Sequence, residues 1–416
     1  MHFSHSAKVE ALRKQLSAFM EDRIVPRLAD WRADVERGTY PVSFMEELKT
    51  AARAAGLWNL FLPGLRDDEP GTRLTNLEYA PLAEIMGRVS WASEVFNCSA
   101  PDTGNMELLH LFGSDSQKRT WLAPLLEGRI RSAFGMTEPD AASSDATNIQ
   151  TTIEHTDTGY VVNGRKWYIT NAAHPDCRIL IVMGRTDLCA DRHRQQSMVL
   201  VPMDTAGVEV VRNVTVMHHH APHGHCEILL RDVRVPHDNL LGLEGDGFLM
   251  AQARLGPGRV HHCMRCIGQA ELALELMVER AKDRTTFGRA LVDHGVVADW
   301  IAESRMEIEQ ARLLVLKTAW MIDNVEGAAA RLEIALIKAV VPRMLTRVAD
   351  RAMQTFGAMG TGPDTPLAEM WTEGRALRIA DGPDEVHRRT IAKLEVAVSR
   401  KRRRASTSYL FTPRRS

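Results

Sequence analysis

The sequence predicts a mainly α-helical protein with a central antiparallel β domain. Helix-period apolar patterns fill residues 1–130 and return over residues 241–416. Between them, residues 131–240 hold short alternating stretches separated by turn residues. We therefore expect three domains, in the order N-terminal helical domain (1–130), small β-sandwich or barrel (131–240) and C-terminal four-helix bundle (241–416).

Composition narrows the class of protein. The chain has 416 residues with 44% apolar residues, enough for large buried cores, and its net charge of −1 offers no basic field for nucleic acid. The six cysteines are scattered and suggest a reducing compartment rather than a disulfide framework. Residues 1–10 lack an apolar signal-peptide core, and no apolar run has membrane-spanning length. We expect a cytoplasmic protein, as in a bacterium, without a membrane span.

The N-terminal domain is predicted from amphipathic patterns. Residues 9–28 form the first, and Ser43 with Glu46 has the spacing of a capping box that opens the second helix. Residues 77–86 and 113–128 read as further helices.

The β domain is predicted from turn signals between short strands. Asp157–Gly159 marks a hairpin, and Asn163-Gly164 reads as a second turn because a type I′ turn needs positive φ at both central residues. Closely spaced strands without intervening helices favour an antiparallel sandwich or barrel.

The C-terminal domain is predicted from long amphipathic segments joined by short connections, as in an antiparallel bundle. The expected helices are residues 267–281, 296–322, 328–356, 373–379 and 385–398.

Asp381, in the stretch Ala380–His387 (ADGPDEVH), lies between the last two expected helices. A carboxylate at a helix-breaking turn can be aimed into a cavity, where it could remove a proton from carbon. An acid-glycine pair is also a common plain turn.

Three further stretches could hold a flat or phosphorylated ligand. The loop Phe134–Pro139 (FGMTEP), followed by Ser143–Asp145, offers amides and hydroxyls that could wrap a ring edge or a phosphate. Alternation along a strand puts Tyr168 and Thr170 on one face, beside a possible flat ring. Arg284–Gly288 (RTTFG) could hold a pyrophosphate. A polar loop, a half-buried strand and a helix C-terminus are the plain structural alternatives.

Histidines gather between His218 and His225. Their spacing fits no common metal-ligand pattern, so we expect no metal site and interpret them as a loop near the active cavity.

Taken together, these stretches resemble the acyl-CoA dehydrogenase family. FGMTEP with SSD resembles its first signature, RTTFG its flavin-diphosphate arginine motif, and Gln354–Gly360 (QTFGAMG) its second glycine motif. The ADGPDEVH stretch is placed like the catalytic carboxylate loop of the family. TEPDAASSDATN and RLGPGRVHHCMR are most similar to the subgroup of human family members 10 and 11, which carry an additional kinase-like domain.

The resemblance implies FAD as cofactor, an acyl-CoA substrate and desaturation of the substrate at Cα–Cβ, with Asp381 as the base. Substrate contacts would involve Ser144, Arg259 and Gly382. A dry site would raise the basicity of Asp381. FAD contacts, partly across a dimer interface, would come from Phe134, Met136, Thr137, Ser144, Tyr168, Thr170, Arg284, Thr286, Phe287, Gln354, Gly357, Pro383 and Glu385.

The resemblance also implies an electron-transfer flavoprotein as acceptor and a homodimer or homotetramer. Several residues depart from the common family pattern: Asp381 stands for a glutamate, Tyr168 for a tryptophan, and Pro383 and Glu385 for a threonine and a glutamine. Two other enzyme hypotheses therefore stay open, a dehydrogenase for 4-hydroxy- or 4-phosphoacyl-CoA and an oxidase like nitroalkane oxidase. A non-catalytic, metal-binding scaffold is the alternative from another class.

Overall fold

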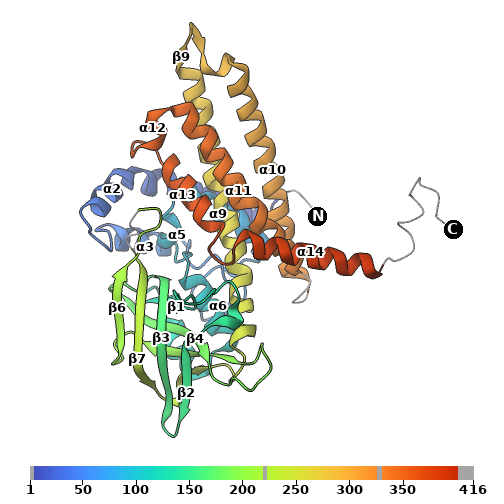
Figure 1. Ribbon diagram of the computed structural model, residues 1–416. Coiled ribbons are helices and arrows are strands. Elements are labelled where there is room, and N and C mark those ends of the chain that lie inside the picture. The colour runs from blue at the N-terminus through green and yellow to red at the C-terminus, as the bar shows by residue number, and fades with distance from the viewer. Residues whose placement is uncertain (1–3, 219–222, 326–329, 402–416) are drawn as a thin grey trace, which may run out of the picture.

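The computed structural model describes residues 4–218, 223–325 and 330–401. Its elements follow the order helices, sheet, helices, which confirms the predicted fold class. In Figure 1 the sheet lies at the bottom, the long C-terminal helices rise above it, and the N-terminal helices pack beside both. Among the described residues, no helix combines the length and apolar character needed to cross a bilayer.

The N-terminal helices differ in detail from the expected ones. The first predicted helix is divided, because α1 ends at Phe19 and a π-helical turn (Met20–Ile24) and a 3₁₀ turn (Val25–Arg27) follow it. The helices of this part are α1 (Ala7–Phe19), α2 (Leu28–Glu36), α3 (Met45–Ala54), α4 (Asn76–Gly87), α5 (Ala92–Val95), α6 (Asp102–Phe112), α7 (Asp115–Gln117) and α8 (Ala123–Leu126).

The capping box predicted at Ser43 and Glu46 was wrong. The Ser43 hydroxyl instead donates to the buried carboxylate of Asp34, at 3.0 Å. Asp34 lies on α2. The Ser43 hydroxyl therefore makes a tertiary hydrogen bond instead of capping a backbone N–H of α3, as the local spacing predicted. Capping boxes do occur at the starts of α4 and α7.

The β domain is one sheet of eight strands, with the order β6-β7-β3-β2-β4-β5-β8 and β1 paired to β4. Most pairings are antiparallel, but β4 pairs in parallel with both β1 and β2, so the sheet is mixed. Within the described residues the path is open, and the predicted barrel does not close. The strands are β1 (Arg131–Gly135), β2 (Thr152–Thr156), β3 (Gly159–Thr170), β4 (Cys177–Arg185), β5 (Gln196–Pro202), β6 (Val208–Asn213), β7 (His225–Val235) and β8 (Leu240–Leu241).

Of the two predicted turns in this domain, the one at Asp157–Gly159 joins β2 to β3, as expected. The turn at Asn163-Gly164 was wrong, because both residues lie inside β3, at an irregularity in its pairing with β7. The Asn163 side chain exchanges hydrogen bonds with Asp232 on β7, at 3.1 and 2.7 Å. The hydrogen bonds to Asp232 therefore stabilise a β-bulge at residues whose local sequence predicts a turn.

The first C-terminal helix begins much earlier than predicted. α9 starts at Gly247 rather than near residue 267 and continues through Pro257. The small strands β9 (Thr285–Thr286) and β10 (Arg289–Ala290) connect α9 to the next helix. The helices are α9 (Gly247–Asp283), α10 (Gly295–Asn324), α11 (Arg331–Phe356), α12 (Ala358–Thr361), α13 (Leu367–Leu377) and α14 (Asp384–Lys401).

Glycines bring α4 and α9 into close contact. A Cβ at Gly87 would lie 2.2 Å from the Arg265 carbonyl oxygen, and one at Gly268 would lie 1.8 Å from the Glu84 carbonyl oxygen. No side chain fits at either position. This contact fixes the position of the middle of α9 relative to the N-terminal domain. The same part of α9 carries residues of the site described next.

Candidate active site

Asp381 lies in the turn between α13 and α14. Asp381 and Gly382 both have positive φ, +55° and +102°, a region in which aspartate is enriched among non-glycine residues. The Asp381 side chain is 25% exposed. Pro383 follows the turn, and Glu385 is exposed in the first turn of α14. The predicted base is thus a carboxylate that is largely buried but still reachable.

Two cationic side chains hold the main chain of this turn. Arg259 Nε donates to the Asp381 carbonyl oxygen at 2.8 Å. Lys338, which is 1% exposed, donates through Nζ to the carbonyl oxygens of Leu377 at 2.7 Å and Ala380 at 2.8 Å. These donors satisfy carbonyls that the end of α13 leaves without partners. The carboxylate itself remains free for other contacts.

The pKa of Asp381 is lowered, which corrects the expectation of a raised basicity. Burial alone would raise it, but the positive charges around the carboxylate outweigh burial. The groups that lower it are His262, whose ring faces the carboxylate, and the cationic side chains of Lys338, Arg254 and Arg259. The carboxylate is therefore ionised and ready to accept a proton, although each nearby cation makes it a weaker base.

Arg254, on α9, links this region to the β domain. Its guanidinium lies 4.0 Å from the ring centroid of Phe134, and its Nε donates to Asn105 Oδ1 at 2.9 Å. The neighbouring Glu107, on α6, is 6% exposed and has an Oε2 without a partner among the described residues. Burial raises the pKa of Glu107 to about 8, against the opposing charge of Arg254. A polar group thus borders the site on the α6 side.

The loop Phe134–Pro139, which was predicted to border the flavin, is anchored by hydrogen bonds to β3. Lys166, fully buried, donates through Nζ to the Met136 carbonyl oxygen at 3.1 Å and to Glu138 Oε1 at 2.9 Å. The Thr137 hydroxyl donates to the Trp167 carbonyl oxygen at 2.6 Å. Met136 and Thr137 remain partly exposed, and Ser144 is exposed. The loop is held rigidly while its outer surface stays open to a ligand.

Tyr168 and Thr170 lie where β3 is irregular. Tyr168 has φ of +53° and is 42% exposed. The register of β3 against β7 shifts between Lys166 and Ile169, so the regular alternation behind the same-face prediction is interrupted. The Thr170 hydroxyl lies 3.0 Å from His225 Nδ1. An exposed aromatic side chain on a strained backbone is free to lie against a flat ring.

The remaining predicted cofactor residues lie at the far end of the helices. Arg284 is the C-cap residue directly after α9, and Thr286 and Phe287 follow it in the β9–β10 hairpin at the top of Figure 1. Phe287 is 96% exposed. Arg280 lies over the ring of Phe356, at 5.4 Å, which brings the ends of α9 and α11 together. The exposed residues Gln354 and Gly357 belong to this end, and the β domain lies at the opposite one.

One copy of the chain therefore presents two separate groups of predicted FAD residues. From Arg259 to Arg284, α9 rises about 38 Å at 1.5 Å per residue. The first group suits a flat ring, because it offers exposed or partly exposed Phe134, Met136 and Tyr168 beside polar Thr137. The second suits a charged diphosphate, because an exposed arginine stands beside hydroxyl groups. The residues fit FAD if two copies share it.

Sequence reasoning missed most of the basic side chains around Asp381. Arg254 and His262 lie within RLGPGRVHHCMR, which was noted only for its resemblance. The spacing of Arg259, His262 and Arg265 at i, i+3 and i+6 places them along one helix face. That periodicity could have revealed them, had α9 been predicted to extend back through Pro257. Lys338 gave no signal, because a lysine in a long helix is ordinarily solvated.

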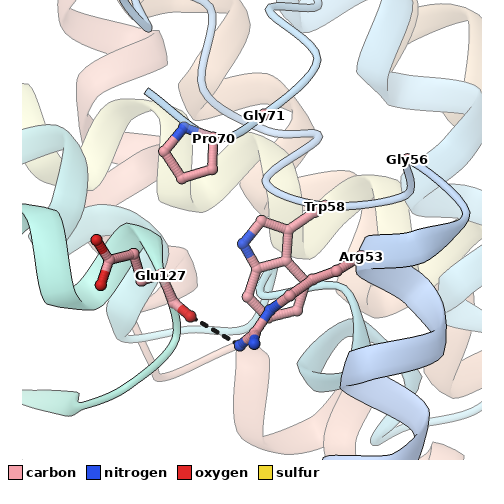
Figure 2. A pocket seen from close by; sticks show the side chains of 6 residues that line it. All are labelled: Arg53, Gly56, Trp58, Pro70, Gly71 and Glu127. Atoms are coloured by element: carbon pink, nitrogen blue, oxygen red, sulfur yellow. Dashed lines mark hydrogen bonds between the residues drawn. The ribbon is translucent and has the colours of Figure 1, made fainter. Parts of the chain in front are cut away.

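A surface cavity of about 340 Å³ lies elsewhere, in the N-terminal domain (Figure 2). Arg53 covers the ring of Trp58 at 4.1 Å and donates through Nη2 to the Glu127 carbonyl oxygen at 2.7 Å. The polar groups of this cavity are thus already engaged with one another. None of its lining residues surrounds Asp381.

The histidine cluster falls partly outside the described residues, since His219 and His220 are not among them. His223 packs against Tyr40, with ring centroids 6.4 Å apart, and against His225, at 5.4 Å. Burial lowers the pKa of His223 to about 4. In the described part of the chain, no three histidine, cysteine or acidic side chains are grouped to hold a metal ion.

Family models cover nearly the whole chain. The N-terminal, middle and C-terminal domains of acyl-CoA dehydrogenase match residues 6–129, 133–233 and 245–395. The Mycobacterium tuberculosis protein named probable acyl-CoA dehydrogenase FadE2 is 55% identical over 95% of this chain and 97% of its own length. Acyl-CoA dehydrogenase family member 10 of mouse is 52% identical over 94% of this chain, which spans only 37% of the mouse protein.

Solved structures of similar fold support the same family assignment. An acyl-CoA dehydrogenase structure from Mycobacterium abscessus is 48% identical with a TM-score of 0.91, covering 95% of this chain and 100% of that one. Butyryl-CoA dehydrogenase from Megasphaera elsdenii is 27% identical with a TM-score of 0.82, over 95% and 100% of the two chains. The fold and the family models together define an oxidoreductase that uses FAD as its cofactor. The chain belongs to the acyl-CoA dehydrogenase family, and the predicted similarity to members 10 and 11 is confirmed.

Proposed function

We propose that this chain is an FAD-dependent acyl-CoA dehydrogenase that introduces a double bond between Cα and Cβ of an acyl-CoA thioester, in the breakdown of fatty or related acyl groups. The observation that carries the proposal is the placement of Asp381. It is an ionised, partly exposed carboxylate on a turn whose main chain is held by Arg259 and Lys338. A base for removing a proton from carbon needs this combination of charge, access and fixed orientation.

In the reaction, the Asp381 carboxylate takes the proton from Cα of the thioester. FAD, when bound, would supply the redox chemistry, as the acceptor of the β-hydrogen as a hydride. The bound thioester also covers the exposed part of Asp381 and removes water from it. This desolvation favours the protonated acid and opposes the nearby cations, so the carboxylate becomes a stronger base when substrate is present.

The remaining assignments are part of the proposal. Phe134, Met136, Thr137, Tyr168 and Thr170 border the flavin ring, and Ser144, Arg259 and Gly382 contact the substrate. Arg284, Thr286, Phe287, Gln354 and Gly357 of a second copy hold the FAD diphosphate and adenine, since these residues lie at the far end of α9 within one chain. Pro383 and Glu385 contact FAD beside the base. The active form is then a homodimer or homotetramer, and an electron-transfer flavoprotein reoxidises it.

A substrate with an oxygen substituent at C4 is the second candidate, because the α6 side of the site is polar. Glu107 Oε2 has no partner among the described residues, and among the same residues Arg254 makes a single hydrogen bond, through Nε to Asn105. A purely hydrocarbon chain would leave the remaining polar groups of Glu107 and Arg254 unmatched. A 4-hydroxy- or 4-phosphoacyl-CoA would supply partners for them.

The test is an anaerobic titration of the purified flavoprotein with acyl-CoAs of increasing length, including 2-methyl and 4-hydroxy forms. Bleaching of the oxidised flavin band by one class establishes the half-reaction and names the substrate. Asp381→Asn should keep the flavin but lose bleaching. A yellow protein that no thioester bleaches, including 4-phosphoacyl-CoA, would overturn the proposal, and oxygen consumption with nitroalkanes would then identify an oxidase.

A further inference from the structure

His262 stands next to the proposed base and has no part in the reaction described above. It lies on α9, one helical turn after Arg259, and its side chain is 22% exposed. Its Nε2 is 3.6 Å from Asp381 Oδ2. Arg259 and His262 therefore meet the same residue from the same helix face, the first at its main chain and the second at its carboxylate.

A third residue of this face sets the protonation state of the imidazole. Arg265 Nη2 lies 3.1 Å from His262 Nδ1. A guanidinium has only donors, so Nδ1 must accept and cannot carry a proton. The single proton of the neutral ring then resides on Nε2, the nitrogen that faces Asp381. Burial and the charge of Arg265 both lower the pKa of His262, in agreement with a neutral ring.

Arg265 is itself well placed to hold this tautomer. It is 7% exposed, and it belongs to the part of α9 that Gly87 and Gly268 lock against α4. The contact between helices thus fixes the guanidinium, the guanidinium fixes the imidazole, and the imidazole presents an N–H to the carboxylate.

We propose that His262 is a positioning residue for Asp381. Arg265 holds its ring as the Nε2–H tautomer, and this N–H of His262 donates a hydrogen bond to the Asp381 carboxylate and orients it toward the substrate. This role rests on the proposed function of Asp381. The present 3.6 Å separation exceeds the range of about 2.7–3.2 Å for such a bond. Catalytic hydrogen bonds are often long without ligand and shorten in the complex.

The role suits an aspartate better than a glutamate. An aspartate carboxylate reaches one methylene less far, and a donor on the adjacent helix can fix which of its oxygens turns toward the cavity. The bond also favours the ionised form of the carboxylate, so its loss should raise the pKa of Asp381. The groups that face this pair are Arg254, Arg259, Cys263 and Arg265 from α9, Lys338 from α11 and His387 from α14. Glu107, from α6, faces Arg254.

The first experiment needs no substrate. The full-length, flavin-bound protein is labelled with ¹⁵N-histidine, and the His262 ring signals are identified by their loss in His262→Gln. We expect a neutral ring protonated at Nε2 between about pH 5 and 8. Below this range, the chemical shift of the ring should change as Asp381 becomes protonated, and this change should disappear in Asp381→Asn. In Arg265→Met the two tautomers should mix. A ring protonated at Nδ1, or an imidazolium at neutral pH, would overturn the proposal.

The second experiment measures the rate of flavin reduction against pH, using the thioester that bleaches the flavin best. His262→Leu should move the acidic limb of the pH–rate profile to higher pH by about one unit, because the Asp381 pKa rises. This is the size expected for the loss of a hydrogen bond to a charged group. His262→Gln, which keeps an N–H, should restore part of the shift.

His261→Leu is the matched control, because His261 is a buried histidine on the same helix that packs against Tyr79 and Phe61 instead of Asp381. Its acidic limb should not move. An unmoved limb in flavin-bound His262→Leu, or an equal shift in His261→Leu, would refute the positioning role. If no thioester reduces the wild-type flavin, the proposed function fails, and the nitrogen spectra still decide whether His262 faces an ionised Asp381 as described.

Discussion

Arg259 holds Asp381 by its main-chain carbonyl, at 2.8 Å, and not by its carboxylate. The guanidinium thereby fixes where the side chain starts and leaves the carboxylate oxygens available for chemistry. Lys338 fixes the preceding residue in the same way. The turn therefore cannot easily retreat to accommodate a longer side chain.

Asp381→Glu tests this restraint. The additional methylene should carry the carboxylate about 1 Å past its working position, and a misplacement of that size can cost about 100-fold in rate. We expect flavin reduction by the best thioester to slow by about that factor while the flavin remains bound. Stopped-flow absorbance measures it, with Asp381→Asn as the inactive reference. An undiminished rate would show that the turn adjusts.

Lys338→Met removes the donor to two carbonyls at the end of α13. Because the site is buried, the loss should lower the free energy of unfolding by about 1–3 kcal/mol. It should also raise the pKa of Asp381, since one of the charges that lowers it is gone. Urea unfolding and the pH profile of flavin reduction report the two effects. Lys317→Met is the control, because Lys317 is 49% exposed and its ion pair with Glu333 should contribute little. Equal destabilisation by both variants would contradict the role of Lys338.

Glu107→Gln tests the buried carboxyl of α6. The pKa of Glu107 is raised to about 8 from an ordinary value of 4.5, so the folded state favours the protonated acid. Its favourable contribution is complete below about pH 4.5 and is lost as pH rises through 8. A glutamine is neutral throughout, so the variant should match wild type near pH 5 and exceed it by a few kcal/mol, on the order of 3, near pH 8.5. Urea midpoints at the two pH values measure this, and a difference independent of pH would count against it.

Lys166→Met tests the anchor of the flavin loop. Lys166 and Glu138 are both buried, and their charges pair at 2.9 Å. Removing one partner of such a pair costs about 3–5 kcal/mol, because the other charge is left without compensation. We expect a lower melting temperature and reduced flavin content, measured from the ratio of flavin to protein absorbance. Adding Glu138→Gln should recover part of the stability. No recovery would mean that the ammonium acts mainly through the carbonyls of Met136 and Met183, its other partners.

Local patterns were sufficient for the order of helices, sheet and helices and for the turn at Asp381. Apolar periodicity is a property of neighbouring residues, and a glycine such as Gly382 adopts positive φ without strain at its own position. The family motifs likewise identified FAD as the cofactor. These features needed no knowledge of what lies across the molecule.

Tertiary structure decided the features that depend on distant partners. A hydrogen bond to Asp232 stabilises a bulge at Asn163-Gly164, and the Ser43 hydroxyl bonds Asp34 instead of capping α3. The helix α9 continues through Pro257. The direction of the Asp381 pKa shift belongs to the same class, because burial and charge oppose each other there. Which of the two prevails depends on side chains of α9 and α11 that only folding brings to the carboxylate.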